Sequence, residues 1–150
     1  MSAGAKPAEA VNEKTEDRPA PAFPAPEANA TSAPWWRGLD EGRLSFQRCG
    51  ACHHAWLPPR TECPKCLSPQ WQWETASGRA KLVSWVVYHH AYHPYFASRL
   101  PYNVAVVELV EGPRMMSNIV EADGRLRIEM PLALVIQRES GVALPRFKPA

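Results

Sequence analysis

The sequence predicts a mainly β protein: a short N-terminal helix and a rubredoxin-like zinc ribbon, followed by a five-stranded OB-fold barrel. Two observations support this prediction. All four cysteines of the 150-residue chain stand in two Cys-x-x-Cys pairs, Cys49/Cys52 and Cys63/Cys66. After residue 76 come about five short apolar runs, which are separated by turn signals and show no long helical pattern. We therefore expect three segments, over residues 1–33, 34–76 and 77–150.

Residues 1–33 are rich in Ala and Pro and carry three basic against five acidic side chains, a net charge of −2. After Met1, the large apolar side chains among them are Val11 and Phe23. This composition predicts a disordered or extended segment, and the prolines from Pro19 to Pro26 favour polyproline II. Two interpretations stay open: a solubilising tail, or an arm that wraps along a partner with Phe23 as its anchor.

The second segment begins with a short helix. Pro34 precedes the helix start, and Gly42 suits its C-terminal end. Trp35 and Trp36 are adjacent, so they point to different sides of so short a helix. One of them can enter the core of its own domain while the other contacts a partner. Packing of both tryptophans on the ribbon is an equally open alternative.

Two predicted strands flank the cysteine pairs. Leu44 and Phe46 share one face of a strand over residues 43–48, which leads into the first pair. Trp71 and Trp73 share one face of a strand that follows the second pair. The ten residues between the pairs make the intervening loop short, so we expect a compact ribbon.

The four cysteines predict a closed tetrahedral zinc site. Two residues between the cysteines of each pair let a tight turn aim both thiolates at one point, and two such turns supply four ligands. Protein thiolates then fill every position, so the metal organises the fold and leaves no position for substrate. Iron bound by the same ligands and disulfides are the alternatives, although disulfides rarely persist in a reducing compartment. His53 and His54 adjoin Cys52 but are surplus as ligands.

The pattern of residues 77–150 predicts the barrel. Strands are expected over residues 79–89, 102–110, 114–120 and 132–137, the last of them buried. Gly141 turns the chain, and residues 144–147 close it. Leu126 and Ile128 form a further short strand or a helical turn. Glu111-Gly112-Pro113 and Asp123-Gly124 mark the turns between them. Small strands of this number suit a closed barrel of the OB type, because closure removes exposed sheet edges.

Histidines and aromatic residues crowd the end of the first barrel strand. Pro94 argues against a helix that would present two histidines together, so a second metal site is not expected. A histidine in general acid–base catalysis, a plug over one barrel mouth, and a loop that contacts a ligand or partner are the open alternatives. The candidate contact residues of this loop are His89, His90, Tyr92, His93, Tyr95 and Phe96.

Composition and motifs limit the possible functions. The net charge of +2 points to no particular partner, and no apolar run approaches a membrane span, so we expect a cytoplasmic protein without membrane contact. No phosphate loop, catalytic triad or paired carboxylates are recognisable, which argues against catalysis by this chain alone. Binding of single-stranded nucleic acid by the OB barrel is the alternative function, although residues 103–120 hold no aromatic residue and one basic residue, Arg114.

The order of these parts resembles a known family. The sequence runs from a Trp-rich helix through "LSFQRCGACHHAWLPPRTECPKC" and "SGRAKLVSWVVYHHAYHP" to "LPYNVAVVELVEGPRMMSNIV" and "RIEMPLALVIQ". Over residues 34–150 this pattern is similar to the zinc-ribbon and OB-fold family that was once a domain of unknown function. Members accompany thiolase-superfamily enzymes. The small subunit of benzoylsuccinyl-CoA thiolase-like complexes and the accessory part of steroid side-chain aldolase-like complexes are two comparisons.

The resemblance implies a non-catalytic accessory subunit. It implies a structural Zn²⁺ on the four cysteines and a hetero-oligomer with a thiolase-superfamily subunit that carries the catalytic residues. It further implies that the OB barrel docks beside the acyl-CoA site of the partner and helps to form or close it, so that a CoA thioester is a ligand of the complex. Trp35, Trp36 and the histidine loop are our own candidates for contacts with the partner or acyl-CoA.

Overall fold

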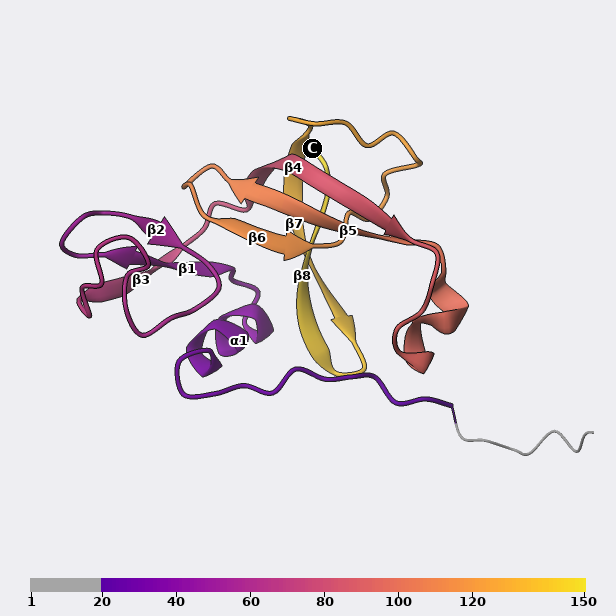
Figure 1. Ribbon diagram of the computed structural model, residues 1–150, viewed down its shortest axis with the longest axis horizontal. Helices are drawn as coiled ribbons and strands as arrows, with labels where there is room; N and C mark the ends of the chain where they lie inside the picture. The colour runs from indigo at the N-terminus through magenta and orange to yellow at the C-terminus, as the bar shows by residue number, and fades with distance from the viewer. Residues whose placement is uncertain (1–19) are drawn as a thin grey trace, which may run out of the picture.

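The structure is a computed structural model that describes residues 20–150, so residues 1–19 of the predicted tail lie outside the described part. A small three-stranded sheet lies beside a larger curled sheet of five strands, and a short helix packs between them (Figure 1). The small sheet and its helix comprise α1 (Ala33–Asp40), β1 (Ser45–Cys49), β2 (Ala55–Trp56) and β3 (Trp71–Thr75). The large sheet comprises β4 (Arg79–Tyr88), β5 (Tyr102–Leu109), β6 (Arg114–Ser117), β7 (Pro131–Glu139) and β8 (Val142–Pro149).

Helix α1 begins with Pro34 in its first turn, as the sequence predicts, and is followed by Gly42 at φ +81°. Its buried face consists of Gly38 and Leu39, and Leu39 belongs to the barrel core. A Cβ on Gly38 would lie 3.2 Å from the carbonyl oxygen of Arg43, so glycine permits this close approach. The helix therefore connects the ribbon to the barrel.

The small sheet has the order β2-β1-β3, with both pairs antiparallel. Leu44 and Phe46 are buried, as the alternation predicts, but Gln47 on the opposite face is fully buried as well. Its side-chain amide donates to the carbonyl oxygen of Arg60 at 2.8 Å and accepts from the N–H of Arg60 at 2.7 Å. Burial of this polar side chain is tolerated because both ends of the amide are paired.

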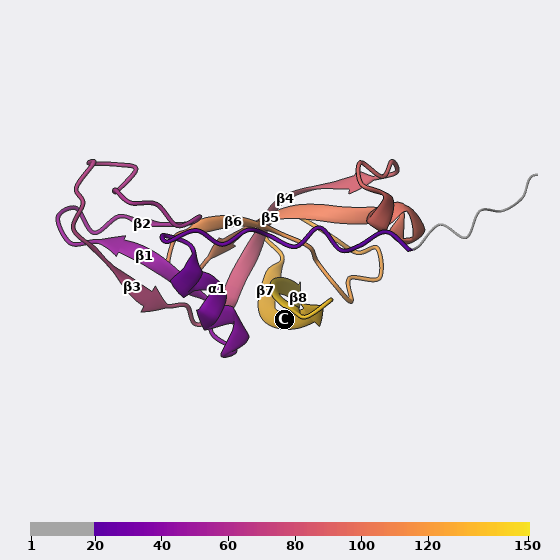
Figure 2. The same cartoon turned by 90° about the horizontal axis from the view of Figure 1, so that it is seen from below.

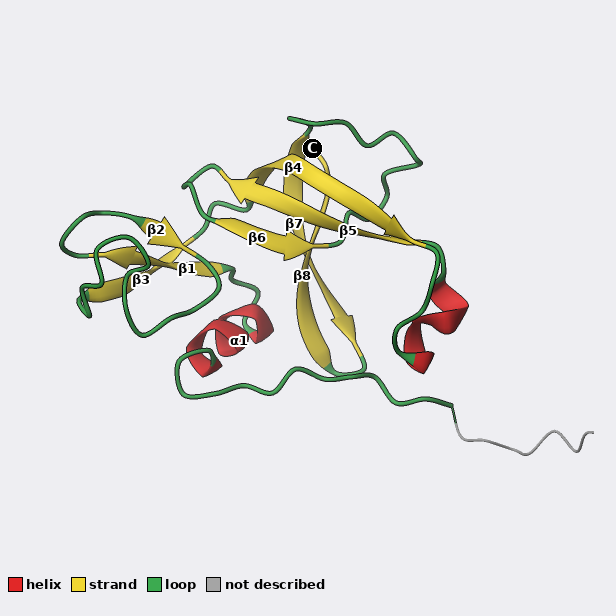
Figure 3. Ribbon diagram, viewed as in Figure 1, coloured by secondary structure: helices red, strands yellow, loops and turns green. Residues whose placement is uncertain are grey.

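The large sheet has the order β6-β5-β4-β7-β8, and every neighbouring pair is antiparallel. Figure 3 shows how strongly it curls, with the β7–β8 hairpin crossing beneath β4 to β6. A bulge between Leu82 and Ser84 shifts the register of β4 against β5. Such a bulge bends a strand and so helps a sheet to curl. Alternate side chains fill the interior, among them Leu82, Ala105, Val107, Leu109, Leu132 and Phe147.

The two edges of the curled sheet meet at one point. Ile119 and Phe147 form an isolated parallel bridge. The N–H of Phe147 donates to Asn118 at 3.1 Å, and the N–H of Val120 donates to Phe147 at 2.8 Å. This seam confirms the predicted five-stranded OB-type arrangement, with closure confined to residues that follow β6 rather than to a full strand pair.

Some elements differ from the sequence expectation. The predicted strand over residues 114–120 ends at Ser117, because Asn118 turns its amide onto β5 and Ile119 crosses to β8. Leu126 and Ile128 lie in an irregular segment, and neither the expected short strand nor the alternative helical turn forms there. The histidine loop contains a 3₁₀-helix, η1 (Pro94–Arg99), which the sequence did not predict. No helix within residues 20–150 is long and apolar enough to cross a membrane.

Residues 20–32 run extended across the bottom of the β7–β8 hairpin, from the end of η1 to α1 (Figure 2). The ring of Phe23 meets that of Tyr95 edge-on, with centroids 5.3 Å apart. Most of the other side chains of this arm are exposed. Within the described residues, the predicted anchor Phe23 therefore contacts this chain itself.

Phe147→Ala is expected to destabilise the barrel by about 3–5 kcal/mol, because it empties the core at the seam. Phe147 is fully buried, whereas Tyr92, the matched control, is 78% exposed. Tyr92→Ala should change the free energy of unfolding by less than about 0.5 kcal/mol. Chemical denaturation of the metal-loaded protein measures both, and equal effects would contradict the proposed closure.

Candidate functional site

The two cysteine pairs form two turns of matching geometry. In the first, the N–H of Cys49 donates to the carbonyl of His54, and the N–H of His53 donates back to Cys49. In the second, the N–H of Cys63 donates to the carbonyl of Ser68, and the N–H of Leu67 donates back to the carbonyl of Cys63. His53 and Leu67, each directly after a second cysteine, have positive φ values of 58° and 60°. This left-handed residue turns the chain away, so both sulfurs of each pair face inward.

The four sulfur atoms converge from these turns. All lie within 4.8 Å of one another, with 3.5 Å between the sulfurs of Cys49 and Cys66 and 3.7 Å between those of Cys52 and Cys63. A tetrahedral zinc with bonds of about 2.3 Å requires sulfurs about 3.8 Å apart. The donor set and its spacing therefore fit a four-thiolate metal site, as the sequence predicts. Neither His53 nor His54 joins the cluster.

The surroundings of Cys49 favour the thiolate that a metal needs. The backbone N–H groups of Cys52 and Ala51 both lie 3.4 Å from its sulfur. These hydrogen bonds outweigh burial and lower the pKa of the Cys49 thiol to about 6. Trp56 and Trp71 pack against Cys49, Cys52 and Cys63, so these five residues form a small apolar cluster at the site.

Trp35 and Trp36 are both half-buried, and their rings meet edge-on with centroids 4.7 Å apart. Both pack against the barrel core and remain partly exposed, so neither ring is inserted fully into the core. A groove of about 430 Å³ opens beside them, with almost wholly apolar walls. Its lining comes from α1, the ribbon and β6, and comprises Ser32, Trp35, Trp36, Leu57, Pro58, Pro59, Met115 and Met116.

The predicted contact residues of the histidine loop divide into two groups. His89, His90 and Tyr92 are exposed. The ring of Tyr92 meets those of Tyr88 and His90 edge-on but stays exposed. The other three are less exposed: His93 accepts the N–H of Tyr95 through Nδ1 at 3.2 Å, and Phe96 packs on Tyr102 with ring centroids 5.7 Å apart. Tyr95, the third, takes part in a cluster around Glu139. The structure thus leaves one half of the set available to a ligand or partner.

A buried ionic cluster that the sequence did not predict holds η1 on the barrel. Glu139 is 9% exposed and pairs with the guanidinium groups of Arg99 and Arg146. The hydroxyl of Tyr95 donates to Glu139 at 2.8 Å and accepts from Arg99 at 2.6 Å. Burial raises the pKa of Glu139, but the hydrogen bonds from Tyr95 and Arg146 outweigh it and hold the pKa below its ordinary value.

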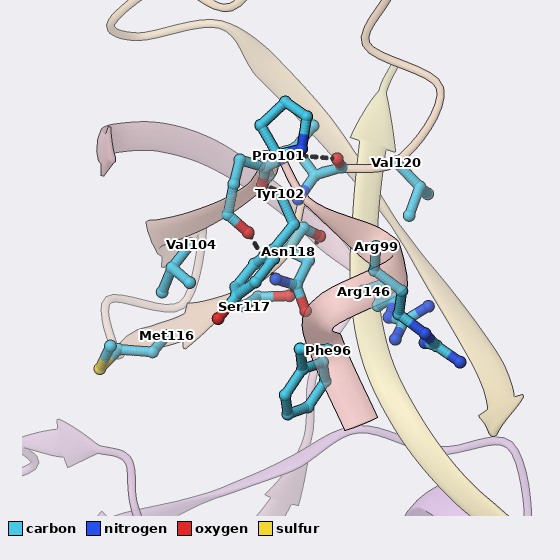
Figure 4. A pocket seen from close by; sticks show the side chains of 12 residues that line it. Phe96, Arg99, Pro101, Tyr102, Val104, Met116, Ser117, Asn118, Val120 and Arg146 are labelled. Atoms are coloured by element: carbon cyan, nitrogen blue, oxygen red, sulfur yellow. Dashed lines mark hydrogen bonds between the residues drawn. The ribbon is translucent and has the colours of Figure 1, made fainter. Parts of the chain in front are cut away.

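A cleft of about 570 Å³ lies between η1 and the seam of the barrel (Figure 4). Its walls are mainly apolar and aromatic, and the guanidinium groups of Arg99 and Arg146 lie together on one side of it. The principal wall residues are Phe96, Tyr102, Val104, Met116 and Val120. The sequence placed Phe96 in the histidine loop but gave no sign of this cleft, because its walls come from segments far apart in the chain.

The outer face of β4 to β6 is apolar in the part formed by Val86, Val104, Val106 and Met116, whereas Lys81, Glu108 and Arg114 form ion pairs farther along the same strands. Val86 opposes Val104 across β4 and β5, and Val106 opposes Met116 across β5 and β6. Val86 is 55% exposed and Met116 is 71% exposed. Met116 lines both the tryptophan groove and the cleft, so the apolar surface continues from one to the other. A continuous apolar surface of this kind is typical of a protein interface.

These features define a class of protein: a four-cysteine ribbon joined to an OB barrel. Residues 36–72 match the family description "ChsH2, rubredoxin-like zinc ribbon domain", and residues 73–137 match "ChsH2, C-terminal OB-fold domain". The chain belongs to this ChsH2 zinc-ribbon and OB-fold family, also called DUF35. The family resemblance and the fold predicted from the sequence are thereby confirmed.

Curated relatives include two longer proteins. The chain is 39% identical over 140 residues to the "Probable enoyl-CoA hydratase alpha subunit" of Thermomonospora curvata, covering 92% of this chain and 43% of the relative. It is 31% identical over 130 residues to the "3-oxo-4,17-pregnadiene-20-carboxyl-CoA hydratase alpha subunit" of Mycobacterium tuberculosis, covering 85% of this chain and 40% of the relative. The chain thus spans about two fifths of these relatives.

The chain is also similar to a shorter relative and to two solved structures. The chain is 33% identical to a "DUF35 domain-containing scaffold protein" of Methanothermobacter thermautotrophicus, covering 59% of this chain and 67% of the relative. The structure entitled "Ltp2-ChsH2(DUF35) aldolase" matches with a TM-score of 0.73 and 38% identity, covering 83% of this chain and 98% of the other. A DUF35 structure from Sulfolobus solfataricus matches with a TM-score of 0.61 and 12% identity, covering 82% of this chain and 87% of the other. This second match shows the fold alone.

Cys49→Ser is expected to lose bound zinc and to unfold the ribbon, because metal binding and ribbon folding are one equilibrium. Elemental analysis and the near-ultraviolet circular dichroism of Trp56 and Trp71 measure the two effects. His54→Ala is the matched control next to the first cysteine turn and should keep one zinc per chain. A Cys49→Ser protein with full zinc content would contradict a four-thiolate site.

Glu139→Gln is expected to lower the free energy of unfolding by about 2–3 kcal/mol at pH 7, because two guanidinium groups lose their charged partner. The pKa of Glu139 is depressed in the folded state, so its stabilisation is present above the ordinary glutamate pKa of about 4.3 and is lost as pH falls through the folded value. The wild-type advantage should therefore shrink below about pH 4.

The control for this pH dependence is Glu121→Gln. Glu121 is 63% exposed and pairs with Lys148 at 3.5 Å, so it should change stability by less than about 1 kcal/mol. Denaturation curves collected from pH 3 to pH 7 give both comparisons. A Glu139→Gln deficit that stays constant over this range would rule out the ionised Glu139 as its source.

Proposed function

We propose that this protein is a non-catalytic accessory subunit of a thiolase-like acyl-CoA enzyme complex, of the aldolase or thiolase type. A structural zinc holds the ribbon, and a thiolase-superfamily subunit carries the catalytic residues. The observation that supports this most strongly is the continuous apolar surface from the tryptophan groove to the outer face of β4 to β6. The structural match entitled "Ltp2-ChsH2(DUF35) aldolase" and the relatives named as alpha subunits or scaffold proteins support the same conclusion.

The metal site supports a structural role. Four cysteine sulfurs meet at one point, which leaves no coordination position for a water or a substrate. The ribbon has a very small apolar core, so the metal supplies most of its stability, in the range of about 10–16 kcal/mol for zinc-finger peptides. Chemistry on an acyl-CoA would then belong to the partner.

The histidine loop and η1 extend from the barrel at the end of β4 (Figure 1). We place this end of the barrel beside the acyl-CoA site of the partner, where the exposed His89, His90 and Tyr92 help to form or close the site. Closing such a site excludes water and positions the bound thioester. The ionic cluster at Glu139 keeps the loop in position, since η1 itself has no buried residue.

Met116→Glu is expected to weaken assembly with the thiolase-superfamily partner by about tenfold or more, because a charge would be buried in an apolar interface. Ile128→Glu, on an irregular segment outside this surface, is the matched control at 54% exposure. Co-purification and titration with candidate partner subunits measure the effect. Equal behaviour of the two variants, or acyl-CoA turnover by the isolated chain, would contradict the proposal.

A further inference from the structure

We infer that the cleft at the barrel seam is a binding site for small organic carboxylates with an apolar body. This goes beyond the proposed function, because the site is built wholly from this chain and requires no partner. The volume of about 570 Å³ lies within the range of small-molecule sites in proteins. A six-carbon carboxylate is therefore well within its capacity.

The walls of the cleft select the apolar body of the ligand. Val104 and Met116 lie on one side, away from the two arginines (Figure 4). The rings of Phe96 and Tyr102 extend the apolar wall toward η1. Met116 is unbranched and flexible, so it can adapt to the shape of a bound chain or ring.

The side-chain amides of Asn103 and Asn118 and the hydroxyl of Ser117, which line the cleft, are already paired within the chain. The amide of Asn103 bonds both backbone groups of Ile119, at 2.7 Å each. The amide of Asn118 donates to the carbonyl of Asn103, and the hydroxyl of Ser117 donates to Pro145 at 2.8 Å. These groups shape the cleft, so recognition of a polar ligand group falls to the arginines.

The arginines leave one positive charge without compensation. Arg99 and Arg146 share the single carboxylate of Glu139, and no carboxylate lines the cleft. Among the described residues, the buried Nε of Arg146 has no hydrogen-bond partner. The Arg99 side chain is 41% exposed, so its guanidinium is accessible to a ligand. One excess positive charge beside an apolar wall matches a monoanion with an apolar body, which is an alkyl or aryl carboxylate.

The test is a titration of the isolated protein with hexanoate and with hexan-1-ol, followed through one methyl resonance each of Val104 and Val120, which line the cleft and not the tryptophan groove. Both probes share the apolar body, and only hexanoate carries the charge. Hexanoate is expected to bind about threefold to fivefold more tightly, the strength of a partly exposed ion pair. Arg99→Gln should remove this preference, so that hexanoate and hexan-1-ol bind equally well, whereas Arg125→Gln, outside the cleft, should keep it.

Equal affinities of the two probes for the wild-type protein would overturn the inference, as would methyl shifts that map outside the cleft. Inorganic phosphate alone should not shift the two methyl groups, and an equal response to phosphate would show a simple anion site instead. Because the isolated chain is used, the outcome is independent of the partner titration with Met116→Glu. Failure of the cleft and failure of the accessory role are thus distinguishable.

Discussion

The convergence of four cysteine sulfurs on one point is the constraint on which this structure depends. The ribbon around it has three short strands and little apolar core: a cluster of Trp56, Trp71 and three of the cysteines, and the buried Phe46. Apolar burial of that extent cannot hold some forty residues in one conformation, whereas metal coordination can. Strand β3 continues through residues 76–78 into β4, and the N–H of Ala76 donates to the carbonyl of Leu44 at 2.8 Å. The cysteine cluster therefore also determines how the ribbon meets the barrel.

That junction gives the molecule its functional surface. The tryptophan groove takes its walls from α1, the ribbon and β6, so it exists only while ribbon and barrel keep their relative placement. Met116 joins this groove to the outer face of the barrel and to the cleft at the seam. This surface, together with four thiolates that can fill every coordination position of a zinc ion, is the basis of the accessory role that we propose.

At the end of the barrel away from the ribbon, an ionic cluster holds the loop in position. Glu139 on β7 binds two arginines and a tyrosine that come from η1 and β8. Since η1 has no buried residue, this cluster and the contact of Phe96 with Tyr102 position it. The same cluster leaves the excess positive charge beside the seam cleft, so one set of contacts holds the loop and sets the electrostatics of the proposed ligand site.

The sequence by itself determined which four cysteines converge, the order of ribbon and barrel, and four of the five barrel strands to within a few residues, because cysteine spacing, alternation and turn residues are local signals. It could not reveal the burial of Gln47, the early end of β6, or the 3₁₀-helix after His93. Nor could it reveal the Glu139 cluster, in which Tyr95 and Arg99 lie 44 and 40 residues from Glu139 in the chain. Pairings of that kind depend on which segments the curled sheet brings together, and only the tertiary structure decided them. The same reason explains the cleft, since no single segment carries both its apolar wall and its arginines.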